Sequence, residues 1–127
     1  MKRIFFSLAL LLAVTTLAAQ TNMTAREAAV KIADRILAST TYEFKNTKTG
    51  ETYKSVKKLP LDMNVKVACK YNNWHYTNGV TNMALMELGD KLADKKYEKY
   101  VLKNMNFVFN EGNLEFFRKQ YDEAFKQ

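Results

Sequence analysis

The sequence predicts an all-α fold built from helical hairpins, and three observations lead to this prediction. Apolar residues recur at three- and four-residue steps from residue 80 to residue 92, and again from residue 97 to residue 109, as in amphipathic helices. The connection between these stretches is short, so the two helices must lie antiparallel. A third stripe with the same period begins at residue 114. We therefore expect a helical hairpin followed by one more helix.

The first twenty residues, 1–20, read as a secretory signal peptide, which leaves 21–127 as the folded part. Two basic residues follow Met1, an apolar run comes next, and small residues close the segment at Ala18 and Ala19. This order is typical of export signals, whereas the apolar run is short for a membrane span. We expect cleavage near Ala19 or Gln20 and a periplasmic or secreted product.

A helix is expected over 24–38, directly after the signal. Thr24 and Glu27 have the spacing of a capping box, in which each side chain binds the other residue's backbone amide. One face of this helix would be lined by Ala29, Ile32, Ala33, Ile36 and Leu37.

Residues 39–73 read as a long irregular or short-β connection. The run from Asn46 to Gly50 has turn chemistry, and Pro60 interrupts regular structure. Glu51 to Val56 fits either a short strand or an extended arm, and the apolar run at 65–68 is too short to assign. Connections of this length are uncommon unless they serve a function.

Three apolar stripes define the expected helices of the second half. The stripe of the first hairpin helix consists of Val80, Met83, Ala84, Leu88 and Leu92. The stripe of its partner consists of Tyr97, Val101, Leu102, Met105, Val108 and Phe109. The stripe of the last helix consists of Leu114, Phe117, Tyr121 and Phe125.

A polar-aromatic cluster, residues 71–76, immediately precedes the hairpin. It contains Trp74, the only tryptophan of the chain, between two tyrosines, with asparagine and histidine side chains interleaved. Aromatic faces stack on sugar rings, and amides or hydroxyls bind sugar hydroxyls and carboxylates. The alternative is that Trp74 anchors the hairpin in the core, and composition alone does not exclude it.

Composition limits the kinds of site that the chain can carry. Cys69 is the only cysteine, so the chain forms no internal disulfide, and its apolar neighbours favour a buried, inert thiol. With His75 as the only histidine, a usual zinc ligand set is missing, and we expect no metal and no cofactor. Asp90, Asp94 and Asp122 read as solvated helix positions rather than as catalytic acids.

The formal charge of +7 falls to +5 when the two basic residues of the signal are removed. A basic exported protein suits an anionic partner such as a polyuronide, a glycosaminoglycan, nucleic acid or anionic lipid. Export argues against nucleic acid, and no membrane segment is expected after signal cleavage. Lysines that simply solvate helix faces would give the same charge.

Several motifs resemble the start of a glycoside hydrolase family 88/105 domain, the unsaturated glucuronyl and unsaturated rhamnogalacturonyl hydrolases. They are the Trp74-His-Tyr-x-Asn-Gly-Val80 motif, the Leu85-x-x-Leu88 step, the Lys96-Tyr-x-x-Tyr-Val101 step and an arm that runs from Phe44 to Glu51. The resemblance covers roughly 24–127 and implies an (α/α)6 barrel, of which 78–110 would supply an early hairpin.

The resemblance also implies a reaction. These hydrolases hydrate the C4=C5 double bond that lyases leave in a terminal uronic acid, and an aspartic acid supplies the proton. No residue here matches the family's aspartates, so the catalytic residues stay unknown and we expect an N-terminal fragment that is inactive alone. Trp74 is the one substrate-binding residue carried over, with an unsaturated uronyl oligosaccharide as its partner. The oligomeric state is unknown.

Two other functions remain open for a chain without an identified acid. One is a non-catalytic exported helical module that binds a polysaccharide or a protein through its 39–76 surface. The other is a small basic protein that acts at an anionic surface.

Overall fold

A computed structural model describes residues 23–126, so the predicted signal peptide lies outside the described residues. Among the described residues, 23–31 belong to one unit and 32–126 belong to a second unit. The first unit contains the beginning of helix α2 (Ala25–Ser39), and every other element belongs to the second. The described residues are mostly helical and include a small antiparallel sheet, so the predicted helical character is confirmed, and the short-β alternative holds for the connection at 39–73.

Helix α2 starts where the capping box predicts. The Thr24 amide donates to the Glu27 carboxylate at 2.8 Å, and the Glu27 amide donates to the Thr24 hydroxyl at 3.2 Å. This reciprocal pair satisfies two amides that the first turn of the helix leaves without partners. The predicted apolar face is only partly right, because Ala33 is buried whereas Ile32 is 63% exposed.

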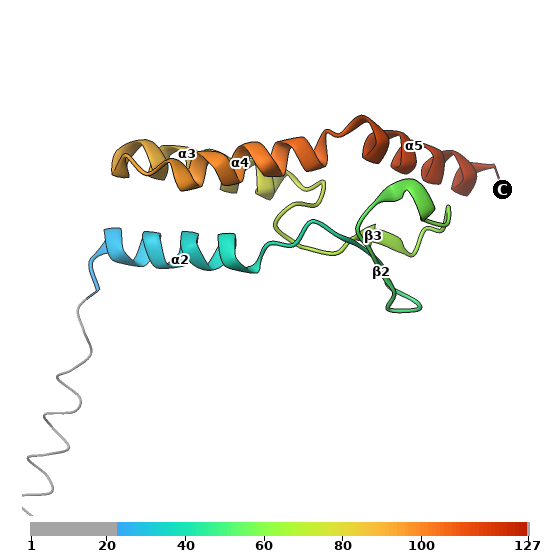
Figure 1. Cartoon of the computed structure of the whole chain (residues 1–127), viewed down its shortest axis with the longest axis horizontal. Coiled ribbons are helices and arrows are strands. Elements are labelled where there is room, and N and C mark those ends of the chain that lie inside the picture. The colour runs from blue at the N-terminus through green and yellow to red at the C-terminus, as the bar shows by residue number, and fades with distance from the viewer. Residues whose placement is uncertain (1–22, 127) are drawn as a thin grey trace, which may run out of the picture. The chain divides into compact units, whose positions relative to one another are not determined.

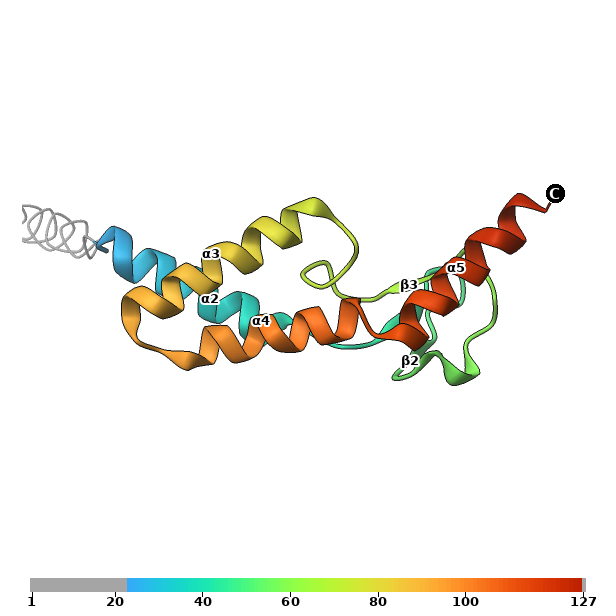
Figure 2. The ribbon, with the colours of Figure 1, turned by 90° about the horizontal axis from the view of Figure 1, so that it is seen from above.

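Helices α3 (Tyr76–Leu92) and α4 (Lys95–Val108) form the predicted antiparallel hairpin (Figure 2). Ala93 ends α3 in the left-handed conformation with a φ of 53°, and the Asp94 side chain caps α4 by accepting from the Lys96 amide at 3.0 Å. Gly89 lets the helices approach at this end, since a Cβ there would lie 3.2 Å from the Asp94 carbonyl oxygen. The turn is therefore fixed by backbone geometry.

The predicted hairpin stripes are partly wrong. In α3, Val80 and Met83 are 60% and 74% exposed, and in α4 Leu102 is 53% exposed. The helices are rotated because asparagine side chains occupy inner positions and bind backbone carbonyls there. The buried core of the hairpin consists of Ala33, Leu85, Tyr97, Tyr100 and Val101, with Ile36, Leu37, Met86, Leu88, Leu92 and Met105 packed around it.

The connection contains more regular structure than the sequence predicts. Strand β1 (Phe44–Asn46) pairs antiparallel with both β2 (Thr52–Tyr53) and β3 (Val65–Val67), which gives the order β2-β1-β3. A short 3₁₀ helix, η1 (Val56–Lys58), lies between β2 and β3. The strands are too short for alternation to identify them, and β3 exists because it pairs with a segment about twenty residues away.

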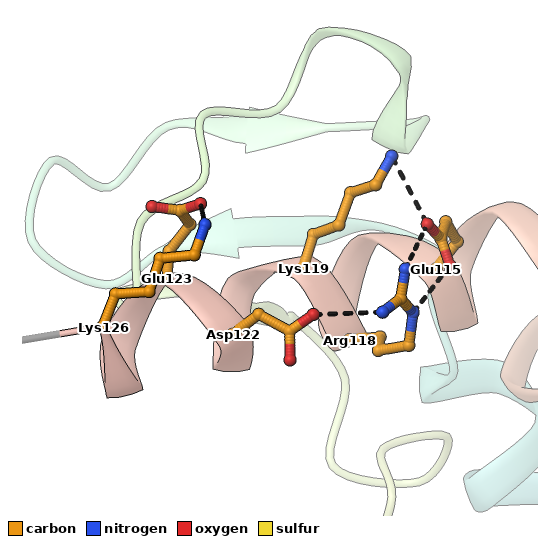
Figure 3. A network of polar contacts seen from close by, with 6 residues as sticks. All are labelled: Glu115, Arg118, Lys119, Asp122, Glu123 and Lys126. Atoms are coloured by element: carbon orange, nitrogen blue, oxygen red, sulfur yellow. Dashed lines mark hydrogen bonds and ion pairs between the residues drawn. The ribbon is translucent and has the colours of Figure 1, made fainter.

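Helix α5 (Glu111–Phe125) covers the sheet (Figure 1). Its Phe116 side chain is buried with Phe44 and Val65 in a second core, and the Gln120 amide donates to the carbonyl oxygens of Asp62 and Val65. The predicted stripe is therefore wrong in part, since the buried positions are Phe116 and Gln120, whereas Tyr121 and Phe125 are 56% and 83% exposed. An ion-pair ladder runs along the outer surface of α5 (Figure 3).

Candidate functional site: an exposed aromatic surface on a fixed loop

The loop from β3 to α3, residues 68–75, presents Trp74 to solvent. The Trp74 side chain is 58% exposed, and its ring packs against Phe109 at the end of α4 with a centroid distance of 5.8 Å. Tyr76, the first residue of α3, is 79% exposed. Trp74 is thus supported on one side and open on the other, which does not fit a core anchor. We define Trp74, His75 and Tyr76 as the aromatic surface.

His75 fixes the junction between the loop and α3. Its Nδ1 accepts from the Thr77 amide at 3.4 Å and lies 2.7 Å from the Thr77 hydroxyl, so the imidazole is the N-cap of the helix. Its ring lies 5.2 Å from that of Tyr76. The lone histidine therefore has a structural role that places the aromatic side chains at a helix N-terminus.

Asn78 holds the loop from the first turn of α3. Its side-chain amide nitrogen lies 2.9 Å from the Lys70 carbonyl oxygen, 3.1 Å from the Asn73 carbonyl oxygen and 2.6 Å from the Asn73 side-chain oxygen. Asn78 is only 9% exposed. One buried side chain thus binds backbone carbonyls at two points of the loop.

Asn104 holds the same loop from α4. Its amide nitrogen donates to the Tyr71 carbonyl oxygen at 3.3 Å and to the Asn82 side chain at 3.2 Å. Asn104 is 1% exposed, and Asn82 is 6% exposed. Because both asparagines lie between the helices, the hairpin fixes the loop that precedes it.

Asn72 connects the loop to the end of the α2–β1 connection. Its amide nitrogen donates to the Thr41 carbonyl oxygen at 2.7 Å, and the side chain is 1% exposed. The expectation that the amides of 71–76 face a sugar is therefore wrong for Asn72. The side-chain oxygens of Asn72 and Asn104 are buried and have no hydrogen-bond partner within the described chain. Each buried oxygen without a partner lowers the free energy of unfolding, and this is a cost of the loop geometry.

A polar cleft of about 390 Å³ adjoins the loop. Cys69 is 8% exposed at its wall, and its sulfur accepts from the Tyr71 amide at 3.4 Å, so the predicted burial of this thiol is confirmed. The residues that line the cleft are Arg35, Ser39, Thr41, Ala68, Cys69, Lys70 and Tyr71.

Several carboxyl groups of the described chain have a pKa that is shifted in the wrong direction for a general acid. A hydrogen bond from Lys96, helped by one from Tyr97, lowers the pKa of Asp34. Hydrogen bonds from Arg118 lower the pKa of Glu115 to about 2. A proton donor near neutral pH needs a raised value. Asp94 caps a helix and Asp122 pairs with Arg118, so these carboxylates have structural partners.

Neither a membrane span nor a metal cluster is found in residues 23–126. No helix there is long and apolar enough to cross a bilayer. No group of three or more histidine, cysteine or acidic side chains in this range is placed to hold a metal ion. Comparisons with protein-family models, with curated proteins and with solved structures found no match for this chain.

Proposed function

We propose that this chain forms part of an exported glycoside hydrolase that removes the unsaturated uronic acid from oligosaccharides generated by polysaccharide lyases. In this proposal α3 and α4 are an early hairpin of an (α/α)6 barrel, and Trp74 borders the sugar site. The observation that carries the proposal is the exposed Trp74 on a loop held by buried asparagines.

The physical basis of the proposal is the stability that the hairpin gives up by burying asparagines in place of apolar side chains. Apolar residues at the inner positions 78, 82 and 104 would each stabilise the hairpin by about 1.5–3 kcal/mol through burial. The chain instead places amides there. Asn78 and Asn104 donate to loop carbonyls, and the Asn82 side-chain oxygen accepts from Asn104. A rigid loop lowers the entropy lost when a ligand binds to it. The arrangement thus favours a binding role for the loop.

The chemistry of the aromatic surface suits an acidic sugar. The exposed Trp74 face can stack on the C–H face of a pyranose ring. The surface lies at the N-terminus of α3, where the positive end of the helix dipole favours a carboxylate. The reaction also needs a positioned acid, and we assign that role to none of the described carboxyl groups.

A barrel would account for the apolar residues that α3 leaves exposed. Tyr76, Val80 and Met83 are spaced on one side of the helix and are 60% to 79% exposed. In a ring of hairpins each helix contacts neighbours on two sides, so such a stripe would be covered. The same stripe supports the alternative, a non-catalytic exported helical module that binds a polysaccharide or a protein partner.

Binding of an unsaturated uronyl disaccharide to the chain tests the proposal. Trp74 is the only tryptophan, so its fluorescence reports directly on this site. We expect a saturable fluorescence change, and calorimetry should show about tenfold weaker binding for Trp74→Ala, as expected for one lost stacking contact.

Tyr121→Ala is the matched control, because Tyr121 is 56% exposed on α5 and packs on Phe125 rather than on the loop. It should leave the affinity unchanged. Equal losses in both variants, or no binding by the wild-type chain, would refute the proposal. If the full-length gene product binds the disaccharide but does not hydrolyse it, the non-catalytic module is favoured instead.

Export is part of the proposal and has its own test. The product isolated from outside the cytoplasm should begin near Gln20 or Thr21, because the small residues at Ala18 and Ala19 fit a cleavage site. N-terminal sequencing decides this point, and a cytoplasmic product that starts at Met1 would refute it.

A further inference from the structure

We propose that the cleft beside the loop binds the carboxylate of an acidic sugar through Arg35 and Lys70. This inference rests on the proposed function only in taking a sugar as the carrier of the carboxylate. Arg35 belongs to the second half of α2, and Lys70 belongs to the loop, so two segments distant in sequence bring the cations to one cleft. The lining residues in the described chain include no Asp or Glu.

Both cations are available for a ligand. Within the described residues neither Arg35 nor Lys70 forms an ion pair, whereas Lys96 and Arg118 are each paired with two carboxylates. The Lys70 ammonium lies 4.9 Å from the centroid of the Tyr71 ring, which places the charge beside another residue of the cleft wall. An anion that enters the cleft therefore meets two positive charges without competition from a protein carboxylate.

The alternative role of these cations is to neutralise the end of α2. A helix C-terminus carries a partial negative charge of about half a unit and free carbonyls that basic side chains can bind. Three of the last four carbonyls of α2 already have partners. The Ile36 carbonyl accepts from the Thr40 hydroxyl at 2.8 Å, the Leu37 carbonyl from the Thr40 amide at 3.4 Å and the Ser39 carbonyl from the Cys69 thiol at 3.9 Å. Two full charges exceed what the dipole alone requires.

Hydrogen-bond capacity also fits a carboxylate. The Ser39 hydroxyl donates to the Arg35 carbonyl and is therefore occupied. The Thr41 hydroxyl forms no hydrogen bond within the described residues and can donate into the cleft. The Thr41 carbonyl is held by Asn72, and the Tyr71 carbonyl is held by Asn104. The cleft wall and the aromatic surface are thus fixed by the same asparagines.

The test is a titration of the chain with D-galacturonate, with D-galactose as the neutral sugar and inorganic phosphate as the sugar-free anion. Amide NMR shifts at Lys70 and Tyr71 report on the cleft. We expect galacturonate to shift these signals and to bind at least tenfold more tightly than either of the other two probes. The carboxylate and the sugar ring would then both contribute.

Charge variants identify the residues responsible. Arg35→Gln and Lys70→Gln should each weaken galacturonate binding about tenfold, as expected for the loss of one hydrogen bond between charged groups. Arg35→Lys should recover part of the loss. Lys66→Gln is the matched control, because Lys66 is exposed on β3 and outside the lining, and it should leave the affinity within about twofold. Thermal melts must show that each variant is folded.

Three results would overturn the inference. They are equal binding of galactose and galacturonate, phosphate binding as tight as galacturonate binding, and equal effects of Lys66→Gln and Arg35→Gln. The proposed function can fail independently of this inference. If Trp74 fluorescence does not respond to the disaccharide but the Lys70 and Tyr71 amide signals still respond to galacturonate, only the proposed function is refuted.

Discussion

Replacing Asn78 by aspartate tests whether the loop is held by amide donors. The substitution keeps the shape of the side chain and exchanges its NH₂ group for oxygen. In the native protein that NH₂ group faces three oxygens, the carbonyls of Lys70 and Asn73 and the side chain of Asn73, at 2.6 to 3.1 Å. Asn78→Asp would therefore place an acceptor against three acceptors in a site that is 9% exposed.

Two effects of opposite sign decide the magnitude. Asn78 lies in the first turn of α3, where a negative charge gains about 0.3–1 kcal/mol from the helix dipole. Against this, at least two acceptors lose their donor, and each buried polar group without a partner costs about 1–3 kcal/mol. The lower end applies to the half-buried Asn73. We therefore expect a net loss of about 2–3 kcal/mol in the free energy of unfolding.

Urea unfolding at neutral pH measures this loss, and Trp74 fluorescence shows whether the loop moves in the folded state. Asn113→Asp is the graded control, because Asn113 occupies the equivalent position of α5 but donates to one carbonyl only, that of Phe107, at 2.8 Å. It should cost clearly less than Asn78→Asp. If Asn78→Asp stays within about 0.5 kcal/mol of wild type, the loop is not held by this amide.

The pH dependence gives a second check on the same variant. The surrounding oxygens raise the pKa of the introduced carboxyl in the folded state, since they disfavour its charged form. Below the pKa of the unfolded chain, about 3.9, the carboxyl is protonated in both states and can donate a hydrogen bond. The stability difference from wild type should therefore be smallest in acid and should grow as the pH rises. A difference that does not change with pH would refute this explanation.

Other predictions concern the helix ends and the α5 surface. Gly79→Ala should stabilise the protein by about 0.5–1 kcal/mol in urea unfolding, because nothing lies within 4 Å of the added Cβ. Gly89→Ala should instead destabilise it by about 1 kcal/mol, since the Cβ would lie 3.2 Å and 3.3 Å from atoms of the α4 end, and a gain there would contradict the close approach. Ala93→Gly should raise the melting temperature by relieving a left-handed alanine, worth about 1 kcal/mol; an unchanged melt would refute the strain. Arg118 lowers the pKa of Glu115 from 4.5 to about 2. The stabilisation from the ionised Glu115 carboxylate is therefore complete above pH 4.5 and is lost as the pH falls towards 2. The difference in melting temperature between wild type and Glu115→Gln should therefore shrink over that interval, and should also shrink with added salt.

The parts of the fold that depend on local chemistry were predictable from the sequence. The capping box marks the start of α2, which runs over Ala25–Ser39 against the expected 24–38. The period of apolar residues identifies α3, α4 and α5, because amphipathic spacing is a property of the helix itself. The exact buried faces were not predictable, since they depend on which elements pack against each helix.

Short β structure was one of the two alternatives predicted for 39–73, but the pairing of its strands and the asparagine contacts depend on distant segments and were missed for that reason. Phe44 pairs with Val67, and neither three-residue strand has a period that identifies it alone. Asn104 donates to the carbonyl of a residue 33 positions earlier in the chain. An asparagine in a helix reads as a solvent-exposed position unless a buried acceptor is known. The one available signal was the repetition of asparagine at 78 and 82, one turn apart on α3.

The buried asparagines at positions 72, 78, 82 and 104 also explain why the exposed Trp74 keeps a defined position. A loop of this kind has few apolar contacts of its own, so its order must come from hydrogen bonds to its backbone. Asn78 and Asn104 supply these bonds from two different helices, and Asn72 ties the loop to the Thr41 carbonyl of the α2–β1 connection. The loop cannot open without breaking contacts of the hairpin core. Rigidity of the aromatic surface is thus tied to the stability of the hairpin, and a ligand that binds Trp74 should stabilise both together.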